Sequence, residues 1–259
     1  MPHIDPLYSV AGLLVGLLVG LTGVGGGSLM TPLLVLAFGF HPATAVGTDL
    51  LYASATKLAG TGMHGWRGTV DWRIVRRLAS GSLPACALTL LVLWLAGIGA
   101  SSTNRTIAAA LGGVLILTGV ATLFRATIVA RLSRSTASAG EARLHGLTIL
   151  LGAVLGTLVT LTSVGAGALG MTALIALYPR APLARLVGSD IAHAVPLTLL
   201  AGLGHWAMGS VDAVLLLALL CGSIPGVLVG SYVASRAPER FLTPVLAVVL
   251  AIVGWRLLA

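Results

Sequence analysis

Apolar residues fill most of this chain in blocks of about 20, the length at which a helix crosses the hydrocarbon core of a bilayer. Glycine, proline and charged residues separate these blocks. The pattern predicts apolar segments at 6–39, 43–63, 75–97, 106–124, 146–178, 187–205, 212–235 and 241–258. The expected fold is therefore all-α, and the protein is expected to be a polytopic integral membrane protein.

Two of these segments, 6–39 and 146–178, are longer than the others and carry a glycine cluster near the centre. The clusters read "GVGGG" from Gly23 and "SVGAG" from Ser163. Glycine favours helix less than any residue except proline, and irregular backbone at membrane depth is tolerated only inside protein or beside a wet cavity. We expect each segment to be a glycine-broken re-entrant or hairpin helix pair. Close helix packing through small residues is the alternative.

The two halves of the chain resemble each other. With an offset of 140 residues "LTGVGGGSL" meets "LTSVGAGAL", and after a one-residue insertion "VGTDLLYASATKLAGTGMHGWRGTVD" meets "VGSDIAHAVPLTLLAGLGHWAMGSVD". The match pairs Asp49 with Asp190. It predicts a single membrane domain, 1–259, with repeat 1 at 6–124, a linker at 125–145 and repeat 2 at 146–258.

Charge is sparse and unevenly distributed. Only 8% of residues are charged, 57% are hydrophobic and the mean hydropathy is +1.04, which leaves no room for a water-facing domain. The net charge of +8 indicates topology rather than nucleic-acid binding. Most basic residues lie in four clusters: Arg67, Arg73, Arg76 and Arg77; Arg125, Arg131, Arg134 and Arg143; Arg180 and Arg185; Arg236 and Arg240.

Cytoplasmic loops are enriched in arginine and lysine. All four basic clusters fall on the cytoplasmic side only if each glycine-centred segment returns to the face from which it enters. Repeat 1 then starts outside and repeat 2 starts inside, so the four-to-five-segment repeats are inverted, as in many secondary transporters. The expected location is the cell inner (cytoplasmic) membrane, with several passes through the bilayer.

Each glycine break is a candidate anion site. Glycine lets backbone N–H groups converge, and the half-helix that follows the break directs its positive N-terminal end at it. Neighbouring hydroxyls and one intramembrane lysine supply further donors. The candidate substrate-binding residues are Thr22, Gly25, Gly26, Gly27, Ser28, Lys57, Thr162, Ser163, Gly165 and Gly167.

The segment after each break is unusually polar for a membrane span. Asp49 and Lys57 fall on one helical stripe, and Asp190 lies on the equivalent stripe with His193 one turn away. Charged residues are costly at the bilayer centre and mark pathways or proton relays. Asp49, Asp190 and His193 are therefore candidates for proton coupling. Two alternatives stay open: both aspartates cap helix N-termini at the interface, or Lys57 pairs with a carboxylate for structure.

Other chemistry is weakly supported by the sequence. The chain has no catalytic triad, nucleotide-binding loop or metal-ligand spacing, so we expect no cofactor and no metal. Cys86 and Cys221 lie in apolar segments. Asp71 and Asp212, in "RGTVDW" and "MGSVDA", are typical of helix starts with an N-cap. A passive anion channel is one alternative function, and an intramembrane enzyme using a thiol or histidine is a weaker one.

The paired motifs "GLTGVGGGSLMTPLL" and "TSVGAGALGMTAL", with "AVGTDL", "LVGSDI" and "GTVDW"/"GSVDA", resemble the TauE/SafE sulfite-exporter-like family of membrane transporters over nearly the whole chain. The resemblance implies secondary transport of a small sulfur-containing or organic anion, such as sulfite or a sulfonate. It does not imply a particular cargo, direction or coupling ion. The second cluster departs from the triple-glycine form, with Ser163 and Ala166 where the first has Gly23 and Gly26. The oligomeric state is left open, with a homodimer as one option.

Overall fold

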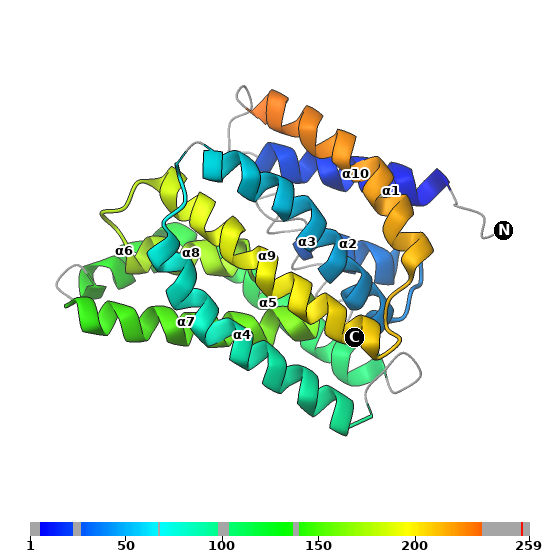
Figure 1. The fold of residues 1–259 in the computed structure, drawn as a ribbon, viewed down its shortest axis with the longest axis horizontal. Coiled ribbons are helices and arrows are strands. Elements are labelled where there is room, and N and C mark those ends of the chain that lie inside the picture. Colours follow the sequence, from blue (N-terminus) through cyan, green and yellow to red (C-terminus); the bar gives the residue numbers. More distant parts are fainter. Residues whose placement is uncertain are drawn as a thin grey trace.

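The computed structural model describes residues 6–22, 27–66, 68–97, 104–136, 140–234 and Trp255. This part of the chain is helical and holds no β-strand (Figure 1). Its helices are α1 (Pro6–Thr22), α2 (Gly27–Leu36), α3 (Pro42–Trp66), α4 (Trp72–Leu95), α5 (Asn104–Leu123), α6 (Arg125–Thr136), α7 (Glu141–Thr162), α8 (Ala168–Leu177), α9 (Leu183–Ala207) and α10 (Ala213–Ala234).

Several of these helices suit a bilayer. Among the described residues, α4, α7 and α9 are each long and apolar enough to cross a membrane. A fourth span results if Ile107–Leu123 and Arg125–Ser133 are taken together, although they meet at a 75° bend. The prediction of an all-α fold is thus confirmed for the described residues, and the apolar helices are consistent with a polytopic membrane protein. The predicted segment 241–258 lies outside the described residues except for Trp255.

The second glycine cluster breaks its segment into two helices. α7 ends at Thr162, and its C-cap Ser163 has the left-handed φ of 59°. Gly165 has a φ of +118°, a conformation that glycine adopts without steric penalty. α8 then begins at Ala168. α1 and α2 are also separate helices, but residues 23–26 between them lie outside the described part of the chain.

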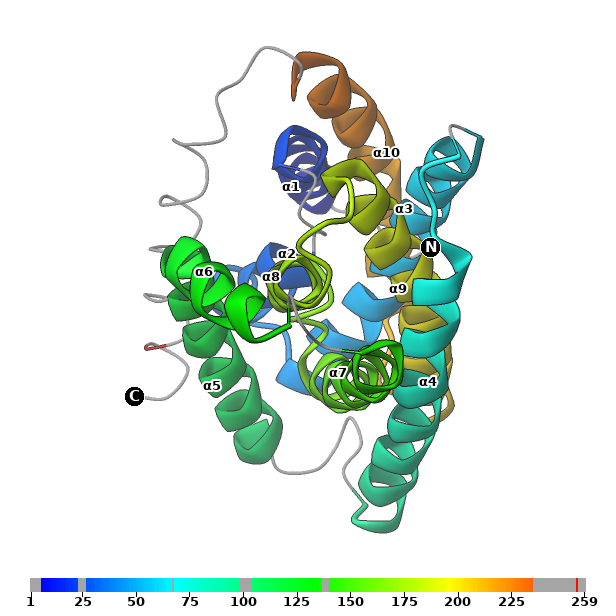
Figure 2. The same cartoon turned by 90° about the vertical axis from the view of Figure 1, so that its left-hand side faces the viewer.

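Helices from different halves of the sequence lie side by side. α1 runs along α10 and α4 runs along α7, with α3 and α9 between these two pairs (Figure 1). Seen end-on, α2 and α8 occupy the middle of the bundle (Figure 2). The two ten-residue helices α2 and α8 are therefore enclosed by longer helices.

Glycines allow the paired helices to touch backbone to backbone. A Cβ at Gly12 would lie 2.4 Å from the carbonyl oxygen of Leu219, and one at Gly152 would lie 2.2 Å from that of Leu78. These two contacts join matching positions of the two halves, because Gly12 corresponds to Gly152 and Leu78 to Leu219. Small residues at membrane helix interfaces permit such close approach. The interpretation of glycine as a packing residue therefore holds at these positions, away from the breaks.

Gly81→Ala tests this packing. A Cβ at Gly81 would lie 2.0 Å from the carbonyl oxygen of Ile149, so we expect α4 and α7 to separate and stability to fall by roughly 1–3 kcal/mol. Gly113→Ala in α5 is the control, because a Cβ there meets no atom within 4 Å. Thermal unfolding of both variants in one detergent measures the difference. Equal melting temperatures would show that the contact does not limit α4–α7 packing.

Equivalent residues of the two repeats also form equivalent hydrogen bonds between the halves of the chain. The backbone N–H of Asp71 donates to Ser189 Oγ at 2.8 Å, and that of Asp212 donates to Thr48 Oγ1 at 3.1 Å. Asp71 caps α4 by accepting from two backbone N–H groups, and Asp212 does the same at the start of α10. The prediction that these aspartates begin helices is confirmed.

α3 and α9, which correspond in the two halves, run antiparallel to each other. Gly202 packs on Leu51 near one end of the pair, and Gly60 packs on Ile191 near the other. Paired residue numbers therefore rise in α3 as they fall in α9. This orientation brings the polar stripes of both helices into the same region of the bundle.

Candidate functional site

Asp49 lies wholly inside the protein, on α3. Its carboxyl Oδ2 accepts a hydrogen bond of 2.5 Å from Thr31 Oγ1 on α2, and the Ser163 side chain in the α7–α8 break faces the same carboxyl. Neither Ser163 Oγ nor Asp49 Oδ1 has a hydrogen-bond partner among the described residues. Asp49 thus lies between α2, the helix that follows the first break, and the α7–α8 break.

Asp190 occupies the matching position on α9 and approaches the other short helix. It is buried, and its Oδ1 lies so close to α8 that a Cβ at Gly170 would be 2.8 Å away. Gly167 is the N-cap of α8, so the carboxyl lies beside the first turn, where helix N–H groups carry partial positive charge. Among the described residues Asp190 Oδ1 has no hydrogen-bond partner.

The interpretation of the two aspartates as N-caps is wrong. α3 begins at Pro42 and α9 begins at Leu183, so both carboxyls lie about two turns inside their helices. Proline is favoured in the first turn of a helix, which explains the early start of α3. The aspartates are therefore buried polar groups of the helix interior.

Lys57 is the only lysine of the chain. It lies on α3, two turns beyond Asp49, and its side chain is half-buried. Its ammonium group interacts electrostatically with Asp190 and, more weakly, with Asp49. It forms no ion pair with any residue in the described ranges. Lys57 therefore lies within electrostatic range of two buried carboxylates without forming an ion pair to either in the described part of the chain.

His193 completes the cluster on α9. The ring is buried, its Nε2 lies 2.8 Å from Ser82 Oγ of α4, and its Nδ1 has no partner among the described residues. His193 also interacts electrostatically with Lys57. We call Thr31, Asp49, Lys57, Ser82, Ser163, Asp190 and His193 the central polar cluster.

Three members or neighbours of this cluster are absent from the sequence-based candidates: Thr31, Ser82 and Tyr52. Tyr52 corresponds to His193 at an offset of 141 residues, and Ser82 corresponds to Ser223. The Tyr52 hydroxyl faces Ser223 just as His193 bonds Ser82. The repeat alignment could have identified these residues, because it pairs Tyr52 with His193 and Ser82 with Ser223, and each of these side chains ends in a polar group.

The remaining candidates divide between the two breaks. Gly165 and Gly167 shape the α7–α8 break. Thr162 Oγ1 donates to the carbonyl of Leu158 and accepts from the N–H of Val164, so its hydroxyl serves the local backbone. At the first break, Thr22 ends α1, Gly27 and Ser28 begin α2, and Gly25 and Gly26 lie outside the described residues.

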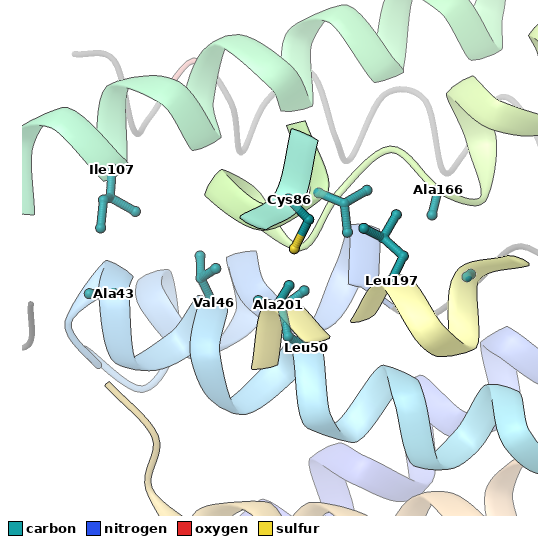
Figure 3. Packing of buried hydrophobic residues seen from close by; sticks show 10 residues of the cluster. Ala43, Val46, Leu50, Cys86, Ile107, Ala166, Leu197 and Ala201 are labelled. Atoms are coloured by element: carbon teal, nitrogen blue, oxygen red, sulfur yellow. The ribbon is translucent and has the colours of Figure 1, made fainter. Parts of the chain in front are cut away.

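The two cysteines are not members of the central polar cluster. Cys86 is buried in an apolar cluster in which aliphatic side chains surround the sulfur (Figure 3), and Cys221 is exposed on α10. The residues that form the Cys86 cluster include no histidine and no carboxylate: Ala43, Val46, Leu50, Ile107, Val159, Ala166, Ala194, Leu197 and Ala201. Within the described ranges no three His, Cys, Asp or Glu side chains are arranged to hold a metal ion.

Comparison with known proteins identifies a family of membrane proteins and several relatives of this chain. A family model described as Sulfite exporter TauE/SafE matches residues 8–257. The probable membrane transporter protein YjnA of Bacillus subtilis (strain 168) is 41% identical over 249 residues, which cover 95% of this chain and 97% of that protein.

Two further relatives are more distant. The probable membrane transporter protein YdhB of Bacillus subtilis (strain 168) is 28% identical over 250 residues, 90% of this chain and 94% of the relative. A probable membrane transporter protein of Xylella fastidiosa (strain 9a5c) is 28% identical over 254 residues, 95% of this chain and 93% of the relative. No solved structure matches the chain.

Proposed function

Because the chain belongs to the sulfite exporter TauE/SafE family of membrane transporters, we propose that it is a secondary transporter for a small sulfur-containing or organic anion, sulfite-like or sulfonate-like, in the cytoplasmic membrane. The observation that carries this proposal is the sole lysine of the chain, which interacts electrostatically with two buried carboxylates, Asp190 and Asp49. An intramembrane cation without a fixed partner is a natural counter-ion for an anionic cargo.

We propose that the repeats are inverted. Support comes from the antiparallel run of the corresponding helices α3 and α9 and from the matched glycine contacts of the α1–α10 and α4–α7 pairs. Exposed tryptophans also lie at opposite ends of the spans, Trp72 at the arginine-rich start of α4 and Trp94 near its other end. Tryptophan is enriched at both membrane interfaces. Alternating access would then follow from rocking one repeat against the other.

The anion would bind where the break, the helix end and the lysine converge. The N-terminal turn of α8 offers backbone N–H groups and a positive dipole end, as helix N-termini do at many anion sites. Ser163 Oγ, buried beside the Asp49 carboxyl, would add a hydroxyl donor. Lys57 supplies the charge. The equivalent first break would contribute the N-terminal turn of α2, which begins at Gly27.

Coupling to protons follows from competition for Lys57. In the empty site the lysine balances Asp190 and Asp49. An anion that takes the lysine as its counter-ion leaves Asp190 as a buried carboxylate with no cation beside it, and such a group is stable only when it binds a proton. Anion and proton would therefore bind together and cross in the same direction. His193, beside Lys57, is the other group that this exchange would affect.

A passive anion channel is the second candidate, since the same cluster could conduct without coupling. Proteoliposome flux separates the two functions, with the anions sulfite, thiosulfate and sulfoacetate and the zwitterionic sulfonate taurine as the panel of compounds. A secondary transporter gives saturable uptake, exchange of internal for external anion, and faster uptake when the proton gradient points in the direction of anion movement. Unsaturable flux without exchange would identify a channel. No flux of any of the four compounds would remove the sulfur-anion assignment.

A further inference from the structure

A second charged site lies at the arginine-rich ends of α4 and α7, apart from the central polar cluster. It is an open cavity of about 640 Å³ whose lining includes Arg73, Arg76, Arg77, Glu141, His145 and Ile149. None of these residues belongs to the central polar cluster. The proposed transport function gives this cavity no role.

The cavity has an excess of positive charge. Glu141 is its one carboxylate, and it accepts from Arg73 Nη1 at 3.3 Å and from Arg77 Nη2 at 3.0 Å. Arg76 is exposed and has no carboxylate partner among the described residues. Three guanidinium groups therefore face one carboxylate, which leaves a net positive site. Guanidinium groups bind phosphate oxygens through parallel, charge-assisted hydrogen bonds.

The surroundings of the cavity are apolar in the direction of the membrane. Ile149 forms part of its lining, the next residue, Leu150, is exposed, and so is Val154 one turn further along α7. Leu88 is exposed on α4, the helix that packs along α7. Trp72, the first residue of α4, is 58% exposed next to Arg73, and tryptophan at a helix end marks the headgroup level of a bilayer. A basic pocket at headgroup depth above an apolar helix surface fits a molecule with an anionic head and acyl chains.

We propose that this cavity binds the phosphate headgroup of an anionic phospholipid, with Arg76 and Arg77 as the main phosphate contacts and the α4–α7 surface beside the acyl chains. Basic pockets between transmembrane helices bind such headgroups in other membrane proteins. A free phosphate would use the guanidinium groups but leave the apolar surface unused. Glu141 competes with the lipid phosphate for Arg77, so its removal strengthens binding.

Native mass spectrometry of the full-length protein, delipidated in detergent and titrated with phosphatidylglycerol or phosphatidylcholine, tests the proposal. Phosphatidylglycerol is expected to bind more tightly than phosphatidylcholine. Arg76→Gln is expected to weaken phosphatidylglycerol binding about fivefold, since one arginine near a membrane surface contributes about that factor. Glu141→Gln is expected to strengthen it. Arg180→Gln, which removes an exposed arginine outside the cavity, is the matched control and is expected to leave affinity unchanged.

Three results would overturn the assignment. Equal affinity for the two lipids would show that the headgroup charge is not recognised. Equal affinity in wild type and Arg76→Gln would place the lipid elsewhere. Full displacement of phosphatidylglycerol by inorganic phosphate would make the cavity a free-phosphate site. The three side chains changed here, Arg76, Glu141 and Arg180, are all exposed, so loss of folding does not confound the comparison.

Discussion

Lys57→Met is expected to weaken the apparent affinity for the transported anion by about 10- to 100-fold, because a charge-assisted hydrogen bond contributes roughly 1.5–3 kcal/mol. The lysine is the only cation of the central polar cluster in the described part of the chain. Methionine keeps the length and the apolar stem of the side chain but removes the charge. The concentration dependence of uptake into proteoliposomes measures the loss.

Two variants serve as controls for this result. Leu58→Ala changes the neighbouring residue, whose side chain is 61% exposed on the outer face of α3, and is expected to transport like wild type. Lys57→Arg keeps the charge with a different shape and is expected to retain part of the affinity. Uptake by Lys57→Met that matches wild type would exclude the lysine from the anion site.

A structural effect of Lys57→Met can be separated from a transport effect. Removing the cation leaves Asp49 and Asp190 buried together, and uncompensated buried charge destabilises a protein. Adding Asp190→Asn removes one of the two carboxylates. The double variant Lys57→Met/Asp190→Asn is therefore expected to recover thermal stability without recovering transport.

The second large effect is expected from Asp190→Asn alone: stimulation of uptake by a proton gradient is lost, while exchange of internal for external anion continues. Asparagine has nearly the shape of aspartate but binds no proton at this position, so the coupled step is missing. Asp190 is the better coupling group of the two aspartates, because the Asp49 carboxyl already accepts the Thr31 hydroxyl and Asp190 is the stronger partner of Lys57.

Asp49→Asn is the matched variant at the corresponding position of repeat 1. The Asp49 carboxyl accepts the Thr31 hydroxyl, and an asparagine carbonyl oxygen can accept the same bond. We expect this variant to keep most of its response to a proton gradient. If the two variants lose the response equally, the two carboxylates act as one unit and the assignment to Asp190 alone is wrong.

The sequence predicted the parts of the fold that depend on local composition and on the repeat. Apolar length located the spans, and the glycine cluster at Gly165 predicted a break that lies between Thr162 and Ala168. The alignment of Asp49 with Asp190 placed both in the central polar cluster. These features follow from hydropathy, glycine chemistry and a fixed offset, none of which needs knowledge of how the helices pack.

Features that depend on packing were not predictable in this way. Thr31 and Ser82 join the cluster only because α2 lies against α3 and α4 lies against α9. No local pattern distinguishes these hydroxyls from others that bond back to their own helix. Each aspartate follows a glycine and a hydroxyl residue, Gly47-Thr48 or Gly188-Ser189, a pattern that suggests a helix start. The N-cap interpretation failed because the helices start about two turns earlier.

The segment from Arg125 shows another limit of hydropathy. Its arginines and serines lower the local hydropathy, so it reads as a linker between the repeats. In the structure Arg125–Thr136 is the helix α6, set at a 75° bend from the preceding span. A helix with basic and apolar residues suits the plane of a membrane interface, where hydropathy alone gives no signal for a span.

The chain offers one direct probe of the anion site, because it contains a single lysine. Reductive methylation with ¹³C-formaldehyde keeps the positive charge and labels only Lys57 and the N-terminal amine. The ¹³C NMR signal of Lys57 is then recorded while an anion that the protein transports is titrated in. We predict a saturable shift of the Lys57 signal, with the N-terminal signal unchanged. An unshifted Lys57 signal at a saturating concentration of that anion would contradict the proposal that the lysine between Asp49 and Asp190 binds the cargo.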